Sequence, residues 1–228
     1  MSNEICAMSA TELLAAYDSG DLSPVQATEA VLERIHNLNG AYNAFCLIDD
    51  EGALASARRS EKRWLVGAPE GRLDGVPASV KDLVLAKGWP TLRGSKTTAR
   101  DQPWDEDAPA VARLREHGAV LLGKTTTPEY GWKGVTDSPL TGVTKNPWNT
   151  EHTPGGSSGG AAVAALCGMG PLHIGTDGGG SVRIPCAFSG IFGIKANFGR
   201  VPVYPASPFG TLSHLGPMTR TVADSAFM

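Results

Sequence analysis

GGSSGG at Gly155–Gly160 and GTDGGGS at Gly175–Ser181 are the two stretches that decide how this chain folds. Each run surrounds serine with glycine, a residue that is conformationally costly in regular secondary structure. Two such runs close together in the sequence predict backbone that approaches a ligand, with N–H groups directed at it. The serines would then supply the chemistry and the glycines their scaffold.

The composition is that of a globular protein with an ordinary core. The chain has 228 residues with 41% hydrophobic content, which is enough for one large domain or two small ones. Its formal net charge is -3, and its Lys and Arg residues are scattered. This pattern predicts neither nucleic acid nor a membrane as a partner. No apolar run approaches the ~20 residues of a transmembrane helix. The composition is compatible with a homodimer.

Cysteine and histidine usage indicates no metal site. The cysteines lack metal-type spacing and no secretory signal is recognised before them, so we predict buried free thiols and a cytoplasmic location. The five histidines show no H-E-x-x-H or related spacing. We therefore expect neither a metal nor another cofactor. The four cysteines are Cys6, Cys46, Cys167 and Cys186.

Residues 1–67 are predicted to form an N-terminal helical region. The SATE sequence that begins at Ser9 is a capping box, and it opens a helix that Gly20 ends. Ser23 followed by proline opens a second helix, which runs to about Gly40. Further along, residues 44–48 are strand-like and residues 50–65 are helical.

Residues 68–228 are predicted to form an α/β core. Apolar strands alternate with helices in this region, which implies a layered arrangement. A helix begins after a predicted N-cap at Thr221 but stops without a C-cap signal, so we expect the chain to be truncated at its C-terminus. The other predicted elements are strands over 76–85, 119–122 and 172–175 and helices over 107–117 and 159–167.

Two motif matches are weighed and set aside. Gly118–Thr125 fits the phosphate-loop formula G-x-x-x-x-G-K-[ST], but its four middle positions form an apolar strand that needs its own N–H groups. Gly155–Gly159 fits the G-x-S-x-G nucleophile elbow, which requires a strand just before it. Residues 146–154 are turn formers with two prolines, so that strand is missing. An elbow serine would also need a downstream Asp and His to form a catalytic triad, and Asp177 with His214 is the candidate pair.

Lys81 is the candidate general base. It interrupts the apolar stretch 76–85, so we expect it to be buried, and burial lowers the pKa of an ammonium by disfavouring its charged form. A lowering of roughly 3 units from ~10.4 would make it useful as a base at neutral pH. The alternative from these residues is an ion pair between Lys81 and neighbouring Asp82.

Three segments in this order resemble the amidase signature family of serine hydrolases. They are GVPASVKD at Gly75–Asp82, GGSSGG at Gly155–Gly160, and GTDGGGSVRIP at Gly175–Pro185. The resemblance extends over about residues 10–228. It implies a mixed sheet core flanked by helices. Family members are roughly twice as long as this chain, which agrees with the expected truncation.

The resemblance also implies a role for each motif residue. Ser181 would be the nucleophile, Lys81 the base, and Ser157 the relay between them, held by a cis peptide bond. The remaining motif residues would build or brace the surrounding loop. Those expected to form an oxyanion hole, together with the N–H of Ser181, are Gly178, Gly179 and Gly180, and those expected to brace the loop are Ser158, Asp177 and Arg183.

The implied activity is hydrolysis of a non-peptide carboxylic amide to an acid and ammonia or an amine, through an acyl-enzyme on serine. The partner would be a small-molecule amide, with Tyr130, Trp132 and Pro202–Phe209 as candidate walls of its pocket. One alternative is a glutaminase like the glutamyl-tRNA(Gln) amidotransferase A subunit. Its motif run is not matched by residues 205–214 of this chain. Another alternative is an inactive, truncated fragment.

Overall fold

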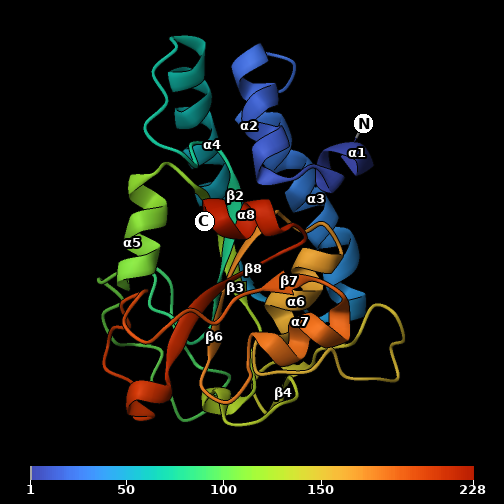
Figure 1. The fold of residues 1–228 in the computed structure, drawn as a ribbon, viewed down its shortest axis with the longest axis vertical. Coiled ribbons are helices and arrows are strands. Elements are labelled where there is room, and N and C mark those ends of the chain that lie inside the picture. The colour runs from blue at the N-terminus through green and yellow to red at the C-terminus, as the bar shows by residue number, and fades with distance from the viewer. Residues whose placement is uncertain (1) are drawn as a thin grey trace.

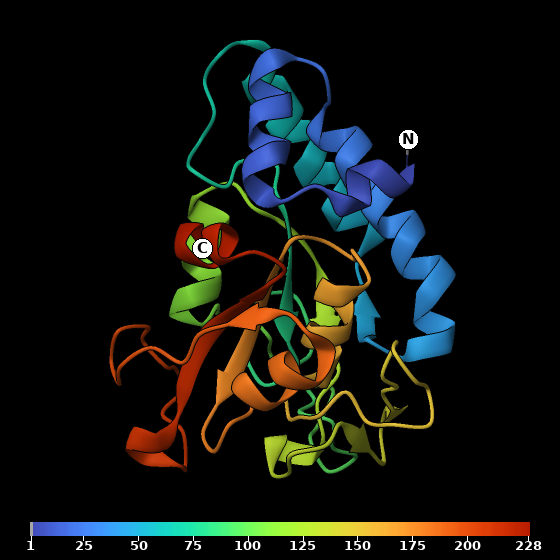
Figure 2. The same cartoon turned by 45° about the vertical axis from the view of Figure 1, so that its right-hand side comes forward.

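The computed structural model describes residues 2–228, and its centre is a six-stranded mixed sheet with helices on both faces (Figures 1 and 2). In sheet order the strands are β1 (Phe45–Ile48), β3 (Val120–Thr125), β2 (Pro77–Lys81), β6 (Leu172–Asp177), β8 (His214–Thr219) and β7 (Phe192–Gly193). The central strand β2 runs parallel to both β3 and β6, whereas the other pairings are antiparallel. A separate ribbon joins β4 (Asp137–Ser138) to β5 (Gly142–Val143). The predicted α/β core with a mixed sheet is confirmed.

The helices form two layers around this sheet. Figures 1 and 2 show α5 and α8 on one side of it and α6 and α7 on the other. The helices are α1 (Ser2–Ala7), α2 (Ala10–Ser19), α3 (Pro24–Tyr42), α4 (Asp50–Leu65), α5 (Pro109–Glu116), α6 (Gly159–Leu166), α7 (Arg183–Ser189) and α8 (Val222–Phe227), with single 3-10 turns at Glu129–Gly131 and Gly210–Leu212. The predicted elements occur in the predicted order, and the elements that were not predicted are α1, α7, β4, β5, β7 and β8.

Alternation along β2 decides what each face of the sheet contains. Ala78 and Val80 are fully buried in the cluster that also contains Val111 and Leu114 of α5. Successive side chains of a strand point to opposite faces, so the alternate residues Ser79 and Lys81 face the layer that contains α6. Lys81 is one of these residues, and its side chain reaches the segment just before α6.

The N-terminal helices begin where their caps predicted. Ser9 and Ser23 each accept an N–H bond at the third helical position, and both complete a capping box. Helix α3 passes through Gly40 and ends at Tyr42, and its C-cap residue Asn43 adopts a left-handed conformation with φ of 53°. Strand β1 pairs with β3 and so belongs to the main sheet. The division of the chain at residue 67 stays a prediction.

Strand β2 is shorter than predicted and ends at Lys81. The chain turns there because the N–H groups of Leu83 and Val84 both donate to the Lys81 carbonyl, at 2.8 and 3.0 Å. Strand β8 was missed because Gly216 and Pro217 in its centre are poor strand formers. Lys81 therefore lies at the carboxyl end of a strand, next to the end of β6.

The cysteines are free, as predicted, but they are not all buried. Cys6 and Cys186 are buried, Cys167 is half-buried and Cys46 is exposed. Within residues 2–228, no cluster of His, Cys, Asp and Glu has the makings of a metal site. None of the helices in that range combines the length and the apolar character that a membrane crossing demands.

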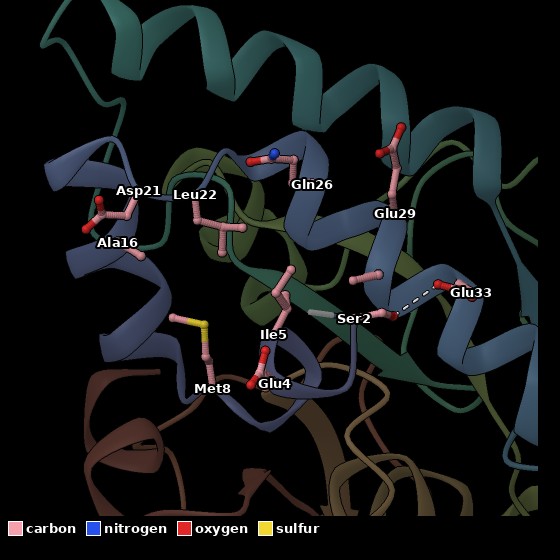
Figure 3. A pocket seen from close by; sticks show the side chains of 11 residues that line it. Ser2, Glu4, Ile5, Met8, Ala16, Asp21, Leu22, Gln26, Glu29 and Glu33 are labelled. Carbon is pink, nitrogen blue, oxygen red and sulfur yellow. Dashed lines mark hydrogen bonds between the residues drawn. The ribbon is translucent and has the colours of Figure 1, made fainter.

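A groove of about 720 Å³ lies between α1, α2 and α3 (Figure 3). Ile5, Met8 and Leu22 provide apolar walls, and Glu29 and Glu33 of α3 lie on one side of it. None of the serines or lysines identified in the sequence motifs lines this groove. Those motif residues lie elsewhere, around the end of β2.

His173 of β6 is a buried histidine that the structure keeps neutral. Its Nδ1 lies 2.7 Å from the Ser79 hydroxyl, and its Nε2 lies 2.9 Å from the carbonyl oxygen of Gly170. The Gly170 carbonyl can only accept, so Nε2 carries the proton and Nδ1 accepts from Ser79. Burial lowers the pKa of His173 to about 3.

This lowered pKa predicts a loss of stability in acid. Between pH ~6.5 and ~3 the unfolded chain binds one proton more than the folded chain. The free energy of unfolding therefore falls by about 1.4 kcal/mol for each pH unit by which the pH is lowered. The contribution is complete above pH ~6.5 and is lost as the pH falls. Urea unfolding of wild type and His173→Gln at several pH values should show that the free energy of unfolding depends less steeply on pH in the variant. The exposed His152→Gln is the matched control, and equal slopes for wild type and His173→Gln would contradict the prediction.

Candidate active site

Lys81 is the centre of the site. Its side chain is fully buried, and its Nζ lies 2.7 Å from Ser157 Oγ, 2.7 Å from Ser158 Oγ and 2.8 Å from Thr176 Oγ1. Burial lowers the pKa of Lys81 well below its ordinary value, and the negative charge of Asp177 acts in the opposite direction. An amine with three hydroxyl neighbours and a lowered pKa can accept a proton from one of them.

Asp82 does not pair with Lys81. Its carboxylate lies 3.5 Å from the Nζ of Lys124, a second fully buried lysine from β3. Lys124 also donates to the Val84 carbonyl at 2.8 Å and to the Thr91 hydroxyl at 2.6 Å. The alternative of a Lys81–Asp82 ion pair is therefore wrong, because a different lysine neutralises Asp82.

Ser157 and Ser158 reach Lys81 from the segment that leads into α6. The peptide bond between Gly156 and Ser157 is cis. No strand precedes Ser157, as predicted, so the nucleophile-elbow geometry is absent there. His214 lies near the backbone carbonyl of Asp177, at 3.3 Å, and the Asp177 carboxylate instead binds Arg183. An Asp–His pair for an elbow serine is therefore not formed.

The glycines of the first run serve packing more than ligand approach. A Cβ on Gly156 would lie 2.5 Å from the Val135 carbonyl oxygen, and one on Gly160 would lie 2.5 Å from Thr126 N. Gly159 is equally crowded, by the Thr136 side chain at 2.3 Å. The expectation that these glycines approach a ligand is corrected here, because they let the start of α6 press against neighbouring backbone.

The second glycine run borders open space. Gly178 and Gly179 are exposed, and a Cβ on Gly179 would meet nothing within 4 Å. Gly180 differs, because its N–H donates to Asp177 Oδ1 at 2.8 Å. That bond occupies the N–H that Gly180 was expected to offer to an oxyanion. In residues 2–228 no such hydrogen bond engages the N–H groups of Gly178, Gly179 or Ser181.

Asp177 braces this loop. Burial raises the pKa of its carboxyl, but the Arg183 guanidinium and the N–H groups of Gly180, Val182 and Arg183 outweigh that effect and hold the pKa at about 2. Arg183 Nε and one terminal nitrogen lie 3.0 and 2.9 Å from the two carboxylate oxygens. Asp177 and Arg183 thus bind each other beside the second glycine run, and their supporting role in the active site stays a prediction.

A cleft of about 950 Å³ opens above these residues. Ser157, Thr176 and Ser181 line its base together with Gly178 and Gly179. The predicted wall residues Tyr130 and Trp132 line it as well, and so do residues 203–209, whereas Pro202 does not. The Trp132 ring stacks on Phe209, with ring centroids 5.7 Å apart and an interplanar angle of 23°.

Ser181 lies in the cleft, half-buried, at the end of the second glycine run. Its carbonyl accepts the Ser158 N–H at 3.2 Å, which fixes the two motifs side by side. Within residues 2–228 no hydrogen bond joins the Ser181 and Ser157 hydroxyls. The structure thus links Lys81 directly to Ser157 and Ser158, and it places Ser181 in the same cleft as Ser157.

Sequence reasoning missed one residue that contacts Lys81, Thr176, and it described the contacts of another, Ser158, incompletely. Thr176 contacts Lys81 as closely as the serines do, and the available signal was its position in the second glycine run beside Asp177. Ser158 was expected only to brace the loop, but its hydroxyl also lies 2.7 Å from Lys81. It further donates to the Thr176 carbonyl at 3.1 Å. Both contacts depend on the meeting of β2, β6 and α6.

Comparison with known proteins places this geometry in a family context. A family model described as Amidase matches residues 26–228. An acylamidase from Rhodococcus erythropolis is 43% identical over 222 residues, covering 97% of this chain and 46% of the relative. The glutamyl-tRNA(Gln) amidotransferase A subunit from Chloroflexus aurantiacus is 39% identical over 226 residues, covering 99% of this chain and 46% of the relative.

A solved structure shares the fold. A bacterial aryl acylamidase, described as belonging to the amidase signature enzymes, superposes with a TM-score of 0.90 at 35% identity. The match covers 96% of this chain and 46% of that one. The chain thus spans about half the length of the curated relatives it matches.

The different surroundings of the two glycine runs predict different effects of an added methyl group. Gly160→Ala should lower the free energy of unfolding by about 1–3 kcal/mol or more, because the new methyl group would overlap the backbone of Ala44 and Thr126. Gly179→Ala, in the other run, should unfold at the wild-type denaturant concentration, because its methyl group meets no neighbour. Equal midpoints for the two variants in urea unfolding would show that close packing is not the reason for glycine at these positions of the first run.

Proposed function

This chain belongs to the amidase family, and we propose that it carries the serine active site of an amidase that hydrolyses a non-peptide carboxylic amide to an acid and ammonia or an amine. The observation that carries the proposal is the buried Lys81 amine, 2.7 Å from Ser157 Oγ, beneath the cleft that contains Ser181. The activity of the whole protein is part of the proposal, because its relatives are about twice as long.

In the first half of the proposed reaction, Ser181 Oγ attacks the amide carbonyl carbon. Its proton passes to Ser157 Oγ as the Ser157 proton passes to the neutral Lys81 Nζ. The tetrahedral intermediate collapses when the C–N bond breaks, and the proton returns from Lys81 through Ser157 to the leaving nitrogen. The products of this half are a free amine and an acyl ester on Ser181.

In the second half, water replaces the amine. Lys81 again accepts a proton through Ser157, now from the attacking water, and the acyl ester on Ser181 is cleaved to the carboxylic acid. Ser181 recovers its proton by the reverse relay. The enzyme returns to its starting state without net gain or loss of protons.

The loop before Ser181 would stabilise the negative oxygen of each intermediate. The N–H groups of Gly178, Gly179 and Ser181 are the candidates, since Gly180 N–H already binds Asp177. Backbone donors in such a position are held ready before the reaction, and loss of one typically costs ~10²–10³ in rate. Asp177 and Arg183 keep this loop in place.

A second candidate function is a glutaminase that supplies ammonia to a partner enzyme. It is favoured by the 39% identity to the amidotransferase polypeptide over 99% of this chain. Both functions share the chemistry described above, so the substrate separates them. Release of ammonia from glutamine in preference to a simple aryl amide would favour the glutaminase, and the opposite preference would favour the amidase.

We predict that Ser181 is the residue that becomes acylated. A fluorophosphonate should label the protein once, and peptide mass spectrometry should place the adduct on Ser181. Ser181→Ala should abolish labelling, while Ser207→Ala, which removes another hydroxyl from the cleft lining, should not. An adduct on Ser157 or Ser158 that persists in Ser181→Ala would refute the assignment.

We predict that Lys81 sets the acid limb of the pH profile. Its neutral form is the base, so kcat/KM should be high above its lowered pKa and should fall tenfold per pH unit below it. Lys81→Ala should remove hydrolysis while far-ultraviolet circular dichroism remains that of the folded chain. Ser158→Ala should do far less harm to the rate, because it leaves the base and Ser157 in place. Near-normal turnover by folded Lys81→Ala would exclude the lysine as the base.

A further inference from the structure

The loop that follows β2 holds Arg93 in an unusual backbone conformation. Arg93 has φ of 57°, in the left-handed region that is unfavourable for residues with a Cβ, and Gly94 follows with φ of 63°. Tyr130, on the neighbouring segment, also has a positive φ of 51°. Such residues gather at binding and active sites, where surrounding contacts hold them in place. Arg93 and Tyr130 both line the cleft above Ser181.

Three hydrogen bonds hold Arg93 in this conformation. The N–H groups on either side of it, from Leu92 and Gly94, donate to the two oxygens of Asp82 at 3.2 and 3.3 Å. The carbonyl of Arg93 itself accepts the Tyr130 N–H at 2.8 Å. Asp82 is the residue after Lys81, so the position of Arg93 is tied directly to the strand that carries the proposed base.

The charges around the cleft leave Arg93 without a partner. Among the described residues, no Asp or Glu lines the cleft, and its lining cations are Arg93 and Lys133. Lys133 Nζ lies 2.7 Å from Asp137, whereas in residues 2–228 no hydrogen bond or ion pair involves the half-buried Arg93 guanidinium. The rest of the lining is largely apolar, with residues such as Leu83 and Trp132. An anion carried on an apolar carbon chain would fit such a surface.

We propose that Arg93 binds a carboxylate of the substrate while the amide group lies at Ser181, so that the preferred substrates are monoamides of dicarboxylic acids. The assignment rests on the proposed amidase function. A guanidinium forms two parallel hydrogen bonds with a carboxylate, which selects for orientation as well as for charge. The backbone conformation at Arg93 is then explained as the one that puts a cation on the cleft wall.

The experiment compares glutaramate with pentanamide, which has a similar chain but no charge. Wild type should hydrolyse glutaramate with the higher kcat/KM. Arg93→Met, which keeps the length of the side chain, should reduce the glutaramate-to-pentanamide ratio of kcat/KM by roughly 10- to 100-fold, mainly through KM. Arg93→Lys should recover part of the ratio. The exposed Arg100→Met, farther along the same loop and outside the cleft, should leave the ratio unchanged.

A glycine variant separates binding from structure. Arg93→Gly suits the left-handed conformation, so it should melt at a higher temperature than wild type and still lose the preference for glutaramate. If Arg93 had a purely structural role, the more stable variant would keep the wild-type ratio. A wild type with no preference for glutaramate, or an Arg93→Met variant with an unchanged ratio, would also overturn the assignment.

Binding of glutarate tests Arg93 independently of catalysis, because this dicarboxylate has no amide to cleave. Calorimetry should detect glutarate binding to wild type and to Arg100→Met, and weaker binding to Arg93→Met by about the same factor as the KM effect. If glutarate binding depends on Arg93 but no amide is hydrolysed, the proposed function fails while the anion site stands. If amides are hydrolysed and glutarate binds wild type and Arg93→Met equally, the anion site fails while the proposed function stands.

Discussion

The burial of one amine, the side chain of Lys81, is the constraint on which the rest of this site depends. An ammonium is costly to bury, and here the lysine is removed from water and surrounded by the hydroxyls of Ser157, Ser158 and Thr176. These hydroxyls can either accept from the amine or donate to it, so they satisfy it in both protonation states. The three neighbours come from two motifs, and the fold must bring both to the end of β2.

Close packing makes that meeting geometrically feasible. The start of α6 lies so near to Thr126, Val135 and Thr136 that a Cβ on the glycines of the first run would overlap their atoms. A helix that sat farther out would leave Ser157 and Ser158 beyond hydrogen-bond reach of the amine. The first glycine run is therefore a packing device that serves chemistry indirectly. The second run, around Gly179, borders the cleft itself.

The acids near Lys81 are each paired with another cation, and among the described residues no carboxylate lines the cleft. Asp82 and Asp177 are the acids closest to it in the motifs, and each has its own cation, Lys124 for the former and Arg183 for the latter. Each acid also organises a loop through backbone N–H groups, Asp82 at residues 92–94 and Asp177 at residues 180–183. Both loops contribute residues to the cleft, Arg93 from one and Ser181 from the other, so these two ion pairs affect both the electrostatics and the shape of the site.

The sequence by itself determined the order of the elements that it predicted, the caps at Ser9 and Ser23, and the three motifs with Lys81, Ser157 and Ser181, because these depend on local patterns of polarity and turn residues. The tertiary structure alone decided that Asp82 pairs with Lys124, that Thr176 and Ser158 both reach the amine, and that Gly180 N–H is taken by Asp177. It also decided that Arg93 lies on the cleft wall. The physical reason is that hydrogen bonds and ion pairs form between atoms close in space, and strand pairing and helix packing bring together residues that are far apart in the chain.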